Sequence, residues 1–536
     1  MDIQGWEWGQ VKIKLGLKSA AQSVTGMAMA AAIAGSAAPA HAQRIEAAVQ
    51  IDTSKAGPVI EREVYGQFAE HLGRSVYEGI WVGENSSIPN TRGYRTDVLE
   101  ALKKIRVPVI RWPGGCFADE YHWRDGIGPR EKRPVRINTH WGWVPETNAF
   151  GTHEFMDFTE LLGAESYIAG NMGSATPQEM ANWVEYMTSD LPTTLANERR
   201  ANGREKPWKV KYIGVGNETW GCGGNMTPEY SADLHKRYQT FIKTPGHIPI
   251  VKVASGANGD NENWTEVMLA RAAGTMNAIS LHYYTLPTGD WSKHGPATGF
   301  DENAWASTLD KATFIGDIIT RHSKIMDKYD PQKKIALYVD EWGTWYDEEP
   351  GTKGGFLYQQ SSLRDAHVAA LTLNIFHRHT DRVKLATIAQ MVNVLQAMIL
   401  TDGPRMLLTP TYHVFDMYQP FQGATPIAAS VTGPNYTHGG VTIPAVDASA
   451  ARGTDGKYYL ALVNSDPDNP ARVTAEIPGI RPKSAAGRIL TGPAMDTHNT
   501  FDRPNTIKPA PFRGRVSGGK LLFDLPSKSV VVVRFD

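Results

Sequence analysis

Two glutamates, Glu218 and Glu341, each follow a short apolar run that is typical of a buried strand. Residues 210–215 lead into Gly-Asn-Glu, which ends at Glu218, and residues 334–339 lead into Asp-Glu-Trp-Gly around Glu341. A carboxyl group at the end of a buried strand is half removed from water, which tends to raise its pKa toward values useful for proton donation. Two such carboxyl groups on two strands of one sheet are the catalytic pair that most glycosidases require.

The elements that must position these glutamates alternate regularly along the chain. Apolar runs are separated by segments with helical spacing, among them 97–106, 177–188 and the charged segment 304–329. Eight such units predict an α/β fold, a (β/α)₈ TIM barrel whose chemistry lies at the carboxyl ends of the strands. The expected strands cover residues 64–71, 107–115, 164–173, 210–215, 248–256, 276–284, 334–343 and 383–390.

Nearly every expected strand carries a polar side chain at its end. These residues are Glu70, Arg111, Asn171, Asn217 with Glu218, His282 with Tyr284, Glu341 and Gln390. Random surface loops would not place a hydrogen-bonding residue at the same end nearly every time. The pattern therefore predicts an enzyme with its site at this end of the barrel.

The expected neighbours suggest different roles for the two glutamates. Tyr284 and Arg111 can donate hydrogen bonds that keep Glu341 ionised as the nucleophile. The nearby negative charge favours a protonated Glu218, which suits a general acid/base. Asn217 can hydrogen-bond a sugar 2-hydroxyl. The sequence does not fix the gap between the carboxyl groups, which is about 5–5.5 Å in retaining enzymes.

Structural alternatives stay open for three of these residues. Arg111 can form an ion pair with Glu70 in the barrel core and order the site indirectly. His282 can be an oriented core histidine, and Gln390 can satisfy a loop.

Composition and spacing argue against several partners. The formal net charge is −1, which gives no electrostatic reason to expect nucleic acid or an anionic membrane. No His-x-x-x-His or His-Glu-x-x-His helix occurs, and Glu70, His71 and His282 lack a recognisable ligand spacing. We therefore expect no catalytic metal and no cofactor.

Residues 1–42 have the pattern of a signal peptide. Lysines precede an Ala-rich apolar run, which ends in an Ala-x-Ala-type cleavage site at Ala42. This predicts cleavage at about Ala42 and an exported protein, either periplasmic or extracellular. No other stretch approaches the roughly 18 apolar residues of a membrane helix.

The C-terminal part of the chain follows a different pattern. Short alternating runs separated by Gly, Asp and Pro predict an antiparallel β-sandwich. The expected organisation is a strand within 43–63 that joins the sandwich, a catalytic barrel over 64–405 and the sandwich over 406–536. The sandwich carries no convergent acid/base set, so we expect a structural role, with carbohydrate binding as the alternative.

Five motifs together resemble the α-L-arabinofuranosidases of glycoside hydrolase family 51. They are Gly-Gln-Phe-Ala-Glu-His-Leu-Gly (66–73), Arg-Trp-Pro-Gly-Gly (111–115), Gly-Val-Gly-Asn-Glu (214–218), Asp-Glu-Trp-Gly (340–343) and Ala-Gln-Met-Val-Asn-Val (389–394). The resemblance extends from about residue 45 to the C-terminus. It implies a barrel plus a sandwich, retaining release of non-reducing α-L-arabinofuranosyl groups from hemicellulose, pectin side chains or oligosaccharides, and often a homo-hexamer.

The resemblance also implies roles for single residues. Glu218 and Glu341 are the implied catalysts, and the arabinose would contact Glu70, Arg111, Asn217, His282, Tyr284 and Gln390. Cys116 occupies a further substrate-binding position, where many relatives have Asn. A thiol hydrogen-bonds weakly, so either the substrate hydroxyl has another partner or Cys116 pairs with Cys222 to shape the pocket. The sequence leaves two free thiols and one disulfide both open.

Two alternative functions are open for this barrel, and one segment of the chain has no assigned role. A β-xylosidase or endoglucanase on the same barrel would need a pocket for a pyranose ring. A non-catalytic carbohydrate-binding protein is disfavoured because both carboxylates are present. Residues 125–148, with Trp141 and Trp143, are expected at the rim of the cleft.

Overall fold

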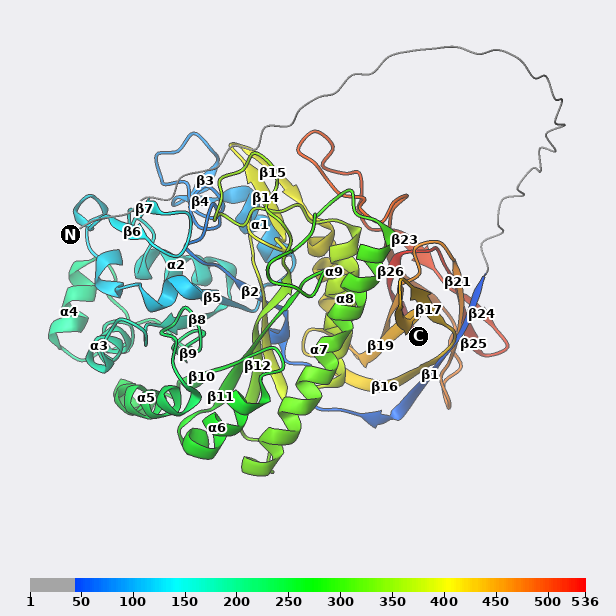
Figure 1. Ribbon diagram of the computed structural model, residues 1–536, viewed down its shortest axis with the longest axis horizontal. Helices are drawn as coiled ribbons and strands as arrows, with labels where there is room; N and C mark the ends of the chain where they lie inside the picture. The colour runs from blue at the N-terminus through cyan, green and yellow to red at the C-terminus, as the bar shows by residue number, and fades with distance from the viewer. Residues whose placement is uncertain (1–43) are drawn as a thin grey trace, which may run out of the picture. The chain divides into compact units, whose positions relative to one another are not determined.

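The computed structural model describes residues 44–536, so the predicted signal peptide, residues 1–42, lies outside the described residues. The described chain forms a closed barrel of eight parallel strands and a large C-terminal sheet (Figure 1). The predicted fold class is therefore confirmed. Within residues 44–536, no helix combines the length and apolar character needed to cross a membrane.

The barrel strands follow one another in sequence order around the barrel. They are β2 (Gly66–Phe68), β5 (Val109–Trp112), β8 (Glu165–Gly170), β9 (Tyr212–Val215), β10 (Val251–Asn258), β11 (Ala278–Thr285), β12 (Ala336–Thr344) and β13 (Val383–Ile388). Each overlaps one strand expected from the sequence. Buried side chains from seven of these strands, including Tyr167, Tyr212 and Tyr338, fill the interior, so the barrel is a packed core that supports the strand ends.

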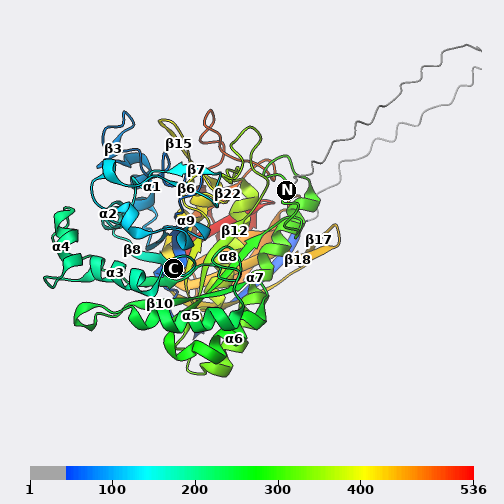
Figure 2. The same ribbon diagram turned by 60° about the vertical axis from the view of Figure 1, so that its left-hand side comes forward.

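Helices cover the outside of the barrel strands (Figure 2). They are α1 (Thr96–Lys104), α2 (Thr152–Leu162), α3 (Pro177–Thr188), α4 (Thr194–Ala201), α5 (Pro228–Phe241), α6 (Glu262–Ala272), α7 (Glu302–Tyr329), α8 (Leu363–Arg378) and α9 (Pro410–Tyr418). Helices α3, α5 and α9 share one start signal, a threonine N-cap followed by proline at the first turn.

Helix α9 differs from the sequence analysis, which expected only strands in this part of the chain. All nine of its residues are buried, so it shows no alternation of polar and apolar faces. The Thr409-Pro410 pair was the one local signal for its start.

The C-terminal domain is a hydrogen-bonded sheet of ten strands. In spatial order they are β23 (Ala510–Arg513), β22 (Ala485–Thr491), β26 (Ser529–Phe535), β20 (Tyr458–Asn464), β19 (Val446–Arg452), β16 (Thr425–Thr432), β1 (Ile45–Ala56), β21 (Ala471–Glu476), β25 (Lys520–Leu525) and β24 (Arg515–Ser517). The N-terminal strand β1 pairs antiparallel with β16 and parallel with β21, so the chain enters the sheet before it builds the barrel.

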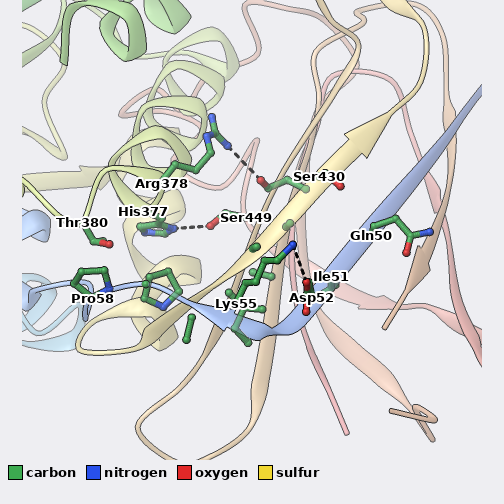
Figure 3. Close-up of a pocket in the computed structure, with 18 of the residues that line it drawn as sticks. Gln50, Ile51, Asp52, Lys55, Pro58, His377, Arg378, Thr380, Ser430 and Ser449 are labelled. Carbon is green, nitrogen blue, oxygen red and sulfur yellow. Dashed lines mark hydrogen bonds and ion pairs between the residues drawn. The ribbon is translucent and has the colours of Figure 1, made fainter. Parts of the chain in front are cut away.

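Helix α8 joins the barrel to this sheet (Figure 1). It contacts β12 of the barrel and also β19, β20 and β26 of the sheet, and residues 363–377 are all buried. Its C-terminal end borders a cavity of about 1010 Å³ that β1, β16 and β19 also line (Figure 3). There His377 Nδ1 lies 2.8 Å from Ser449 Oγ, and Lys55 pairs with Asp52 at 3.2 Å.

Candidate active site

A cavity of about 340 Å³ opens at the carboxyl ends of the barrel strands. Three carboxylates and four indole rings line it: Glu70, Glu218 and Glu341, with Trp141, Trp220, Trp291 and Trp345. This volume is within the range of small-molecule sites. Flat apolar rings beside carboxylates suit a sugar, which presents C–H faces and hydroxyl groups.

Glu341 is held between two hydrogen-bond donors on the inner surface of β12. Arg111 Nη1 donates to Glu341 Oε1 at 2.8 Å, and the Tyr284 hydroxyl donates to Oε2 at 2.7 Å. The register of β11 against β12 sets His282 directly beside Glu341. Both donors point their hydrogens at the carboxyl oxygens and hold the group in one orientation.

A second buried carboxylate, Asp340, balances the cations beneath the cavity. It lies 3.7 Å from Arg111 Nε and 3.2 Å from His282 Nε2, and it accepts a hydrogen bond of 2.6 Å from Tyr167. Burial alone would raise the pKa of Asp340, but Arg111, His282 and Tyr167 hold it below its usual value. Asp340 was not predicted to have a role, although it lies within the Asp-Glu-Trp-Gly motif.

His282 is the second cation of this cluster. Burial alone would lower its pKa, but the charge of Glu341 and the contacts with Asp340 and Glu218 raise it to about 10. The imidazolium and the Arg111 guanidinium together neutralise Asp340 and Glu341. Asp340, Glu341 and Glu218 share these two positive charges, one fewer than their three carboxyl groups.

Glu218 lies just after β9 and has an unusual backbone conformation. Its φ is 41°, in the left-handed region, and Gly216 before it has a φ of 84°. His282 Nδ1 lies 2.8 Å from Glu218 Oε1. Burial and the charge of Glu341 raise the pKa of Glu218, although the contact with His282 opposes this. The arrangement favours a protonated carboxyl group.

The two glutamates meet although their strands are three positions apart around the barrel. One carboxylate oxygen of Glu218, one of Glu341 and a ring nitrogen of His282 all lie within 4.8 Å of one another. His282 is therefore the bridge between a carboxyl group that favours its proton and one that favours its charge.

The third carboxyl group of the cavity, Glu70, accepts three hydrogen bonds. The donors are Phe117 N at 3.0 Å, Trp141 Nε1 at 2.9 Å and Gln390 Nε2 at 2.9 Å. Burial and the charge of Glu341 raise the pKa of Glu70 to about 7. A Cβ atom on Gly115 would come within 2.9 Å of Glu70 Oε1, which explains the glycine in the Pro-Gly-Gly turn. Arg111 pairs with Glu341 and Asp340 rather than with Glu70, contrary to the core ion pair considered from the sequence.

The residues proposed from the sequence divide into two groups. Glu70, Cys116, Glu218, Tyr284, Glu341 and Gln390 line the cavity. Arg111, Asn217 and His282 lie behind its wall, each at most 3% exposed. Asn217 Oδ1 accepts a 2.5 Å hydrogen bond from Arg111 Nη2, so its oxygen is already used within the protein. Asn171 is a loop residue, whose amide donates to Tyr121 O and Ser174 Oγ.

Asp119 organises three loops of the site and was missed from the sequence. Its buried carboxylate accepts hydrogen bonds from the backbone N–H groups of Met172, Gly173 and Asn217 at 2.6, 2.8 and 2.8 Å. It thus joins the loops that follow β5, β8 and β9. Its position four residues after the Pro-Gly-Gly turn was the only signal in the sequence.

The segment 125–148 contributes one tryptophan to the cavity. Trp141 lines the cavity through its contact with Glu70, whereas Trp143 is 73% exposed. The segment also forms the hairpin of β6 (Arg136–Asn138) and β7 (Val144–Glu146).

A disulfide between Cys116 and Cys222 forms part of the cavity wall. It joins the loop after β5 to the loop after β9, and the Cys222 and Cys116 sulfurs lie 3.5 and 4.0 Å from Glu218 Oε2. Because disulfide sulfurs carry no proton, these are packing contacts rather than hydrogen bonds. Of the two arrangements that the sequence left open, the structure shows the bonded one.

Among residues 44–536, two groups of donor atoms lie close enough together to hold a metal ion. In the first, the sulfurs of Cys116 and Cys222 are used by the disulfide and are not thiolates. In the second, His282 lies between Glu218 and Glu341, and its pKa of about 10 keeps both ring nitrogens protonated. A metal needs a neutral imidazole, so the donor chemistry fits a proton-sharing cluster better than a metal site.

The disulfide can be counted directly. We expect no titratable thiol in the unfolded, unreduced protein and two after reduction. A thiol assay in denaturant measures both numbers. Two thiols before reduction would contradict the bond.

The charge balance beneath the cavity predicts the titration of His282. In the intact protein its NMR signals should stay those of an imidazolium up to about pH 10. Replacement Glu341→Gln removes the largest favourable charge, so the pKa of His282 should fall. His367 is an internal control, because burial lowers its pKa to about 4 and its two ring nitrogens lie beside backbone carbonyl groups rather than carboxylates. A His282 titration that is identical in both proteins would contradict the proposed charge balance.

Comparison with known proteins agrees with this geometry. Residues 101–302 match the model of the alpha-L-arabinofuranosidase 1 domain, and residues 340–529 match that of the alpha-L-arabinofuranosidase C-terminal domain. The chain is 50% identical to the intracellular exo-alpha-L-arabinofuranosidase of Bacteroides ovatus, over 91% of this chain and 95% of that protein.

Solved structures extend the similarity to the whole described fold. The family 51 arabinofuranosidase of Xanthomonas axonopodis pv. citri is 54% identical with a TM-score of 0.91, over 92% of this chain and 100% of that one. The alpha-L-arabinofuranosidase of Thermotoga maritima in its arabinose complex is 30% identical with a TM-score of 0.80, over 91% and 99%.

One expectation from the sequence is overturned by these comparisons. The pattern of residues 1–42 predicted an exported protein, but the Bacteroides ovatus relative, half identical over most of the chain, is named intracellular. The expected periplasmic or extracellular location is therefore corrected. The sequence identity over most of the chain and the shared structure establish that this protein belongs to the α-L-arabinofuranosidases of glycoside hydrolase family 51.

Proposed function

We propose that this enzyme is a retaining, exo-acting α-L-arabinofuranosidase that releases non-reducing terminal α-L-arabinofuranosyl groups. The proposal rests on one observation: carboxylate oxygens of Glu218 and Glu341 lie within 4.8 Å of each other. Retaining glycosidases hold their carboxyl groups about 5–5.5 Å apart, whereas inverting enzymes leave about 6.5–9.5 Å for a water molecule. The distance between the two carboxyl groups is therefore closer to that of retaining enzymes.

In the first step, Glu341 attacks the anomeric carbon and forms a glycosyl-enzyme bond. Arg111 and Tyr284 orient the carboxylate, and both donors remain in place when the ester is later broken. Glu218 gives its proton to the glycosidic oxygen as the bond to the leaving group breaks.

In the second step, the same residues act in reverse. Glu218, now ionised, removes a proton from water, and the hydroxyl group attacks the anomeric carbon of the ester to Glu341. The 15% exposure of the Glu218 side chain, against 6% for Glu341, gives water access to the base while the nucleophile stays covered.

The cavity supports recognition of a single terminal sugar. Its volume of about 340 Å³ and its tryptophan walls suit one ring, and Glu70 and Gln390 present carboxyl and amide groups to the sugar hydroxyls. Arg111, Asn217 and His282 act as positioning residues behind the wall, a change from the direct contacts implied by the family resemblance. Cys116 contributes shape through the disulfide rather than a hydrogen bond.

The names of the relatives support the substrate class. One is called an exo-alpha-L-arabinofuranosidase, and another was solved in an arabinose complex. We propose arabinose-containing hemicellulose, pectin side chains and oligosaccharides as substrates. The homo-hexamer implied by the resemblance stays a prediction, which light scattering can measure.

Product stereochemistry tests the mechanism and the sugar together. With 4-nitrophenyl α-L-arabinofuranoside, ¹H NMR should show α-arabinofuranose as the first product, before mutarotation. The corresponding β-D-xylopyranoside should react far more slowly, which separates this function from that of a β-xylosidase. A first product of β configuration would contradict the double displacement.

Substitution of each glutamate should separate their roles. Glu341→Gln should lower kcat by about 10⁴-fold or more with every substrate, because the covalent step is lost. Glu218→Gln should lower kcat/KM, which reports the first step, by about 10²–10⁴-fold with an alkyl leaving group but much less with a 4-nitrophenyl group, which needs no proton for that step. Steady-state kinetics with the two substrates measures this. An equal loss on both substrates in Glu218→Gln would argue against its role as the acid.

A further inference from the structure

A second cavity, of about 580 Å³, adjoins the active-site cavity. The two share Asn258, Tyr284 and Trp291 in their linings. The second cavity lies between the carboxyl ends of β10 and β11 and the side of α7. We call it the α7 groove.

The α7 groove presents aromatic rings to solvent. Trp291 is 50% exposed, and its ring packs edge-on against Tyr284 at 6.3 Å and against Trp345 at 5.4 Å. Phe314, on α7, is 38% exposed and lies 6.3 Å from the ring of Tyr283. Exposed rings in a groove beside an active site are typical of a binding surface, and they offer faces to the C–H groups of sugars.

The charged groups of the α7 groove are mainly acidic. Its lining contains Asp260, Asp310 and Asp317 and one cation, Lys311, which lies 3.6 Å from Asp310. Arg321, outside the lining, lies 3.7 Å from Asp260, is shared with Glu262, and holds its guanidinium 5.4 Å from the centre of the Phe314 ring, so the other face of that ring is the one available to a sugar. Carboxylates can accept hydrogen bonds from sugar hydroxyls, but an excess of them repels an anionic ligand.

The direction of the leaving group connects the two cavities. Glu218 must protonate the glycosidic oxygen, so the leaving sugar lies on the Glu218 side of the arabinose. The next strand around the barrel from Glu218 is β10, and β10 ends at Asn258, which both cavities share. A chain attached to the arabinose can therefore pass from the catalytic cavity over Trp291 into the α7 groove.

We propose that the α7 groove binds the uncharged sugar backbone that carries the arabinofuranosyl branch. This inference rests on the function proposed above and adds to it a site and a selectivity. Phe314 and Trp291 stack on backbone sugars, and the aspartates accept their hydroxyl groups. Backbones that carry uronic acids are disfavoured, because their carboxylates would face three aspartates with one lysine.

Phe314→Ala tests the groove without touching the catalytic cavity. With a neutral arabinosylated xylo-oligosaccharide, kcat/KM should fall by about 3- to 10-fold, the range expected for one aromatic contact. With 4-nitrophenyl α-L-arabinofuranoside it should stay unchanged, since this substrate has no backbone. Phe241→Ala is the matched control, because Phe241 is also an exposed phenylalanine on a helix, 52% exposed at the end of α5. An unchanged ratio of the two kcat/KM values in Phe314→Ala would overturn the proposal.

The double variant Asp310→Asn/Asp317→Asn tests the charge selectivity. Its kcat/KM on a uronate-bearing arabinosylated oligosaccharide should rise several-fold relative to the neutral one, most strongly at low ionic strength. A wild-type preference for the uronate-bearing substrate, or no change in the variant, would overturn the selectivity. Failure of the proposed function is distinct, because the wild type would then not hydrolyse the aryl arabinofuranoside at all.

Discussion

The buried cluster of Arg111, His282, Asp340 and Glu341 is the interaction on which the site depends. Two cations and two anions share a largely buried region, where an unpaired charge is costly. Within the cluster the two cations match the two anions in number, and the hydroxyls of Tyr167 and Tyr284 donate to Asp340 and Glu341. Burial and the charge of Glu341 raise the pKa of Glu218 despite its contact with His282, and Arg111 and Tyr284 both donate to Glu341, so the two carboxyl groups have different surroundings although they nearly touch.

The barrel supplies this cluster because its strands converge. Neighbouring strands β11 and β12 set His282 beside Glu341 through their register, while β5 brings Arg111 from the other side of the barrel. The tyrosine-filled interior supports the cluster from below, since Tyr167 both packs in that layer and donates to Asp340. The barrel core and the active site are thus in direct contact, so a substitution in the core can shift the residues of the site.

Strand positions and the two glutamates were predictable from sequence because both depend on local patterns. Apolar runs between helical segments identified all eight barrel strands, and all but one of these runs end in polar residues. The partner of each buried side chain was not predictable, since it depends on register and barrel closure. An ion pair between Arg111 and Glu70 was considered from the sequence, but Arg111 pairs with Asp340 and Glu341. The side-chain oxygen of Asn217 accepts a hydrogen bond from Arg111 instead of facing the cavity. Asp119 was missed because its partners are backbone groups of distant loops.

The disulfide between Cys116 and Cys222 also affects the unfolded chain, in which the active site is lost. It closes a loop with a sequence separation of 106 residues, which includes the barrel strands β8 and β9 and helices α2, α3 and α4. A closed loop of about 100 residues reduces the entropy of the unfolded ensemble by an amount equivalent to roughly 4–5 kcal/mol. A cross-link that shapes the wall beside Glu218 thereby keeps a quarter of the barrel tethered during denaturation, and the molecule gains resistance to unfolding from a feature of its active site.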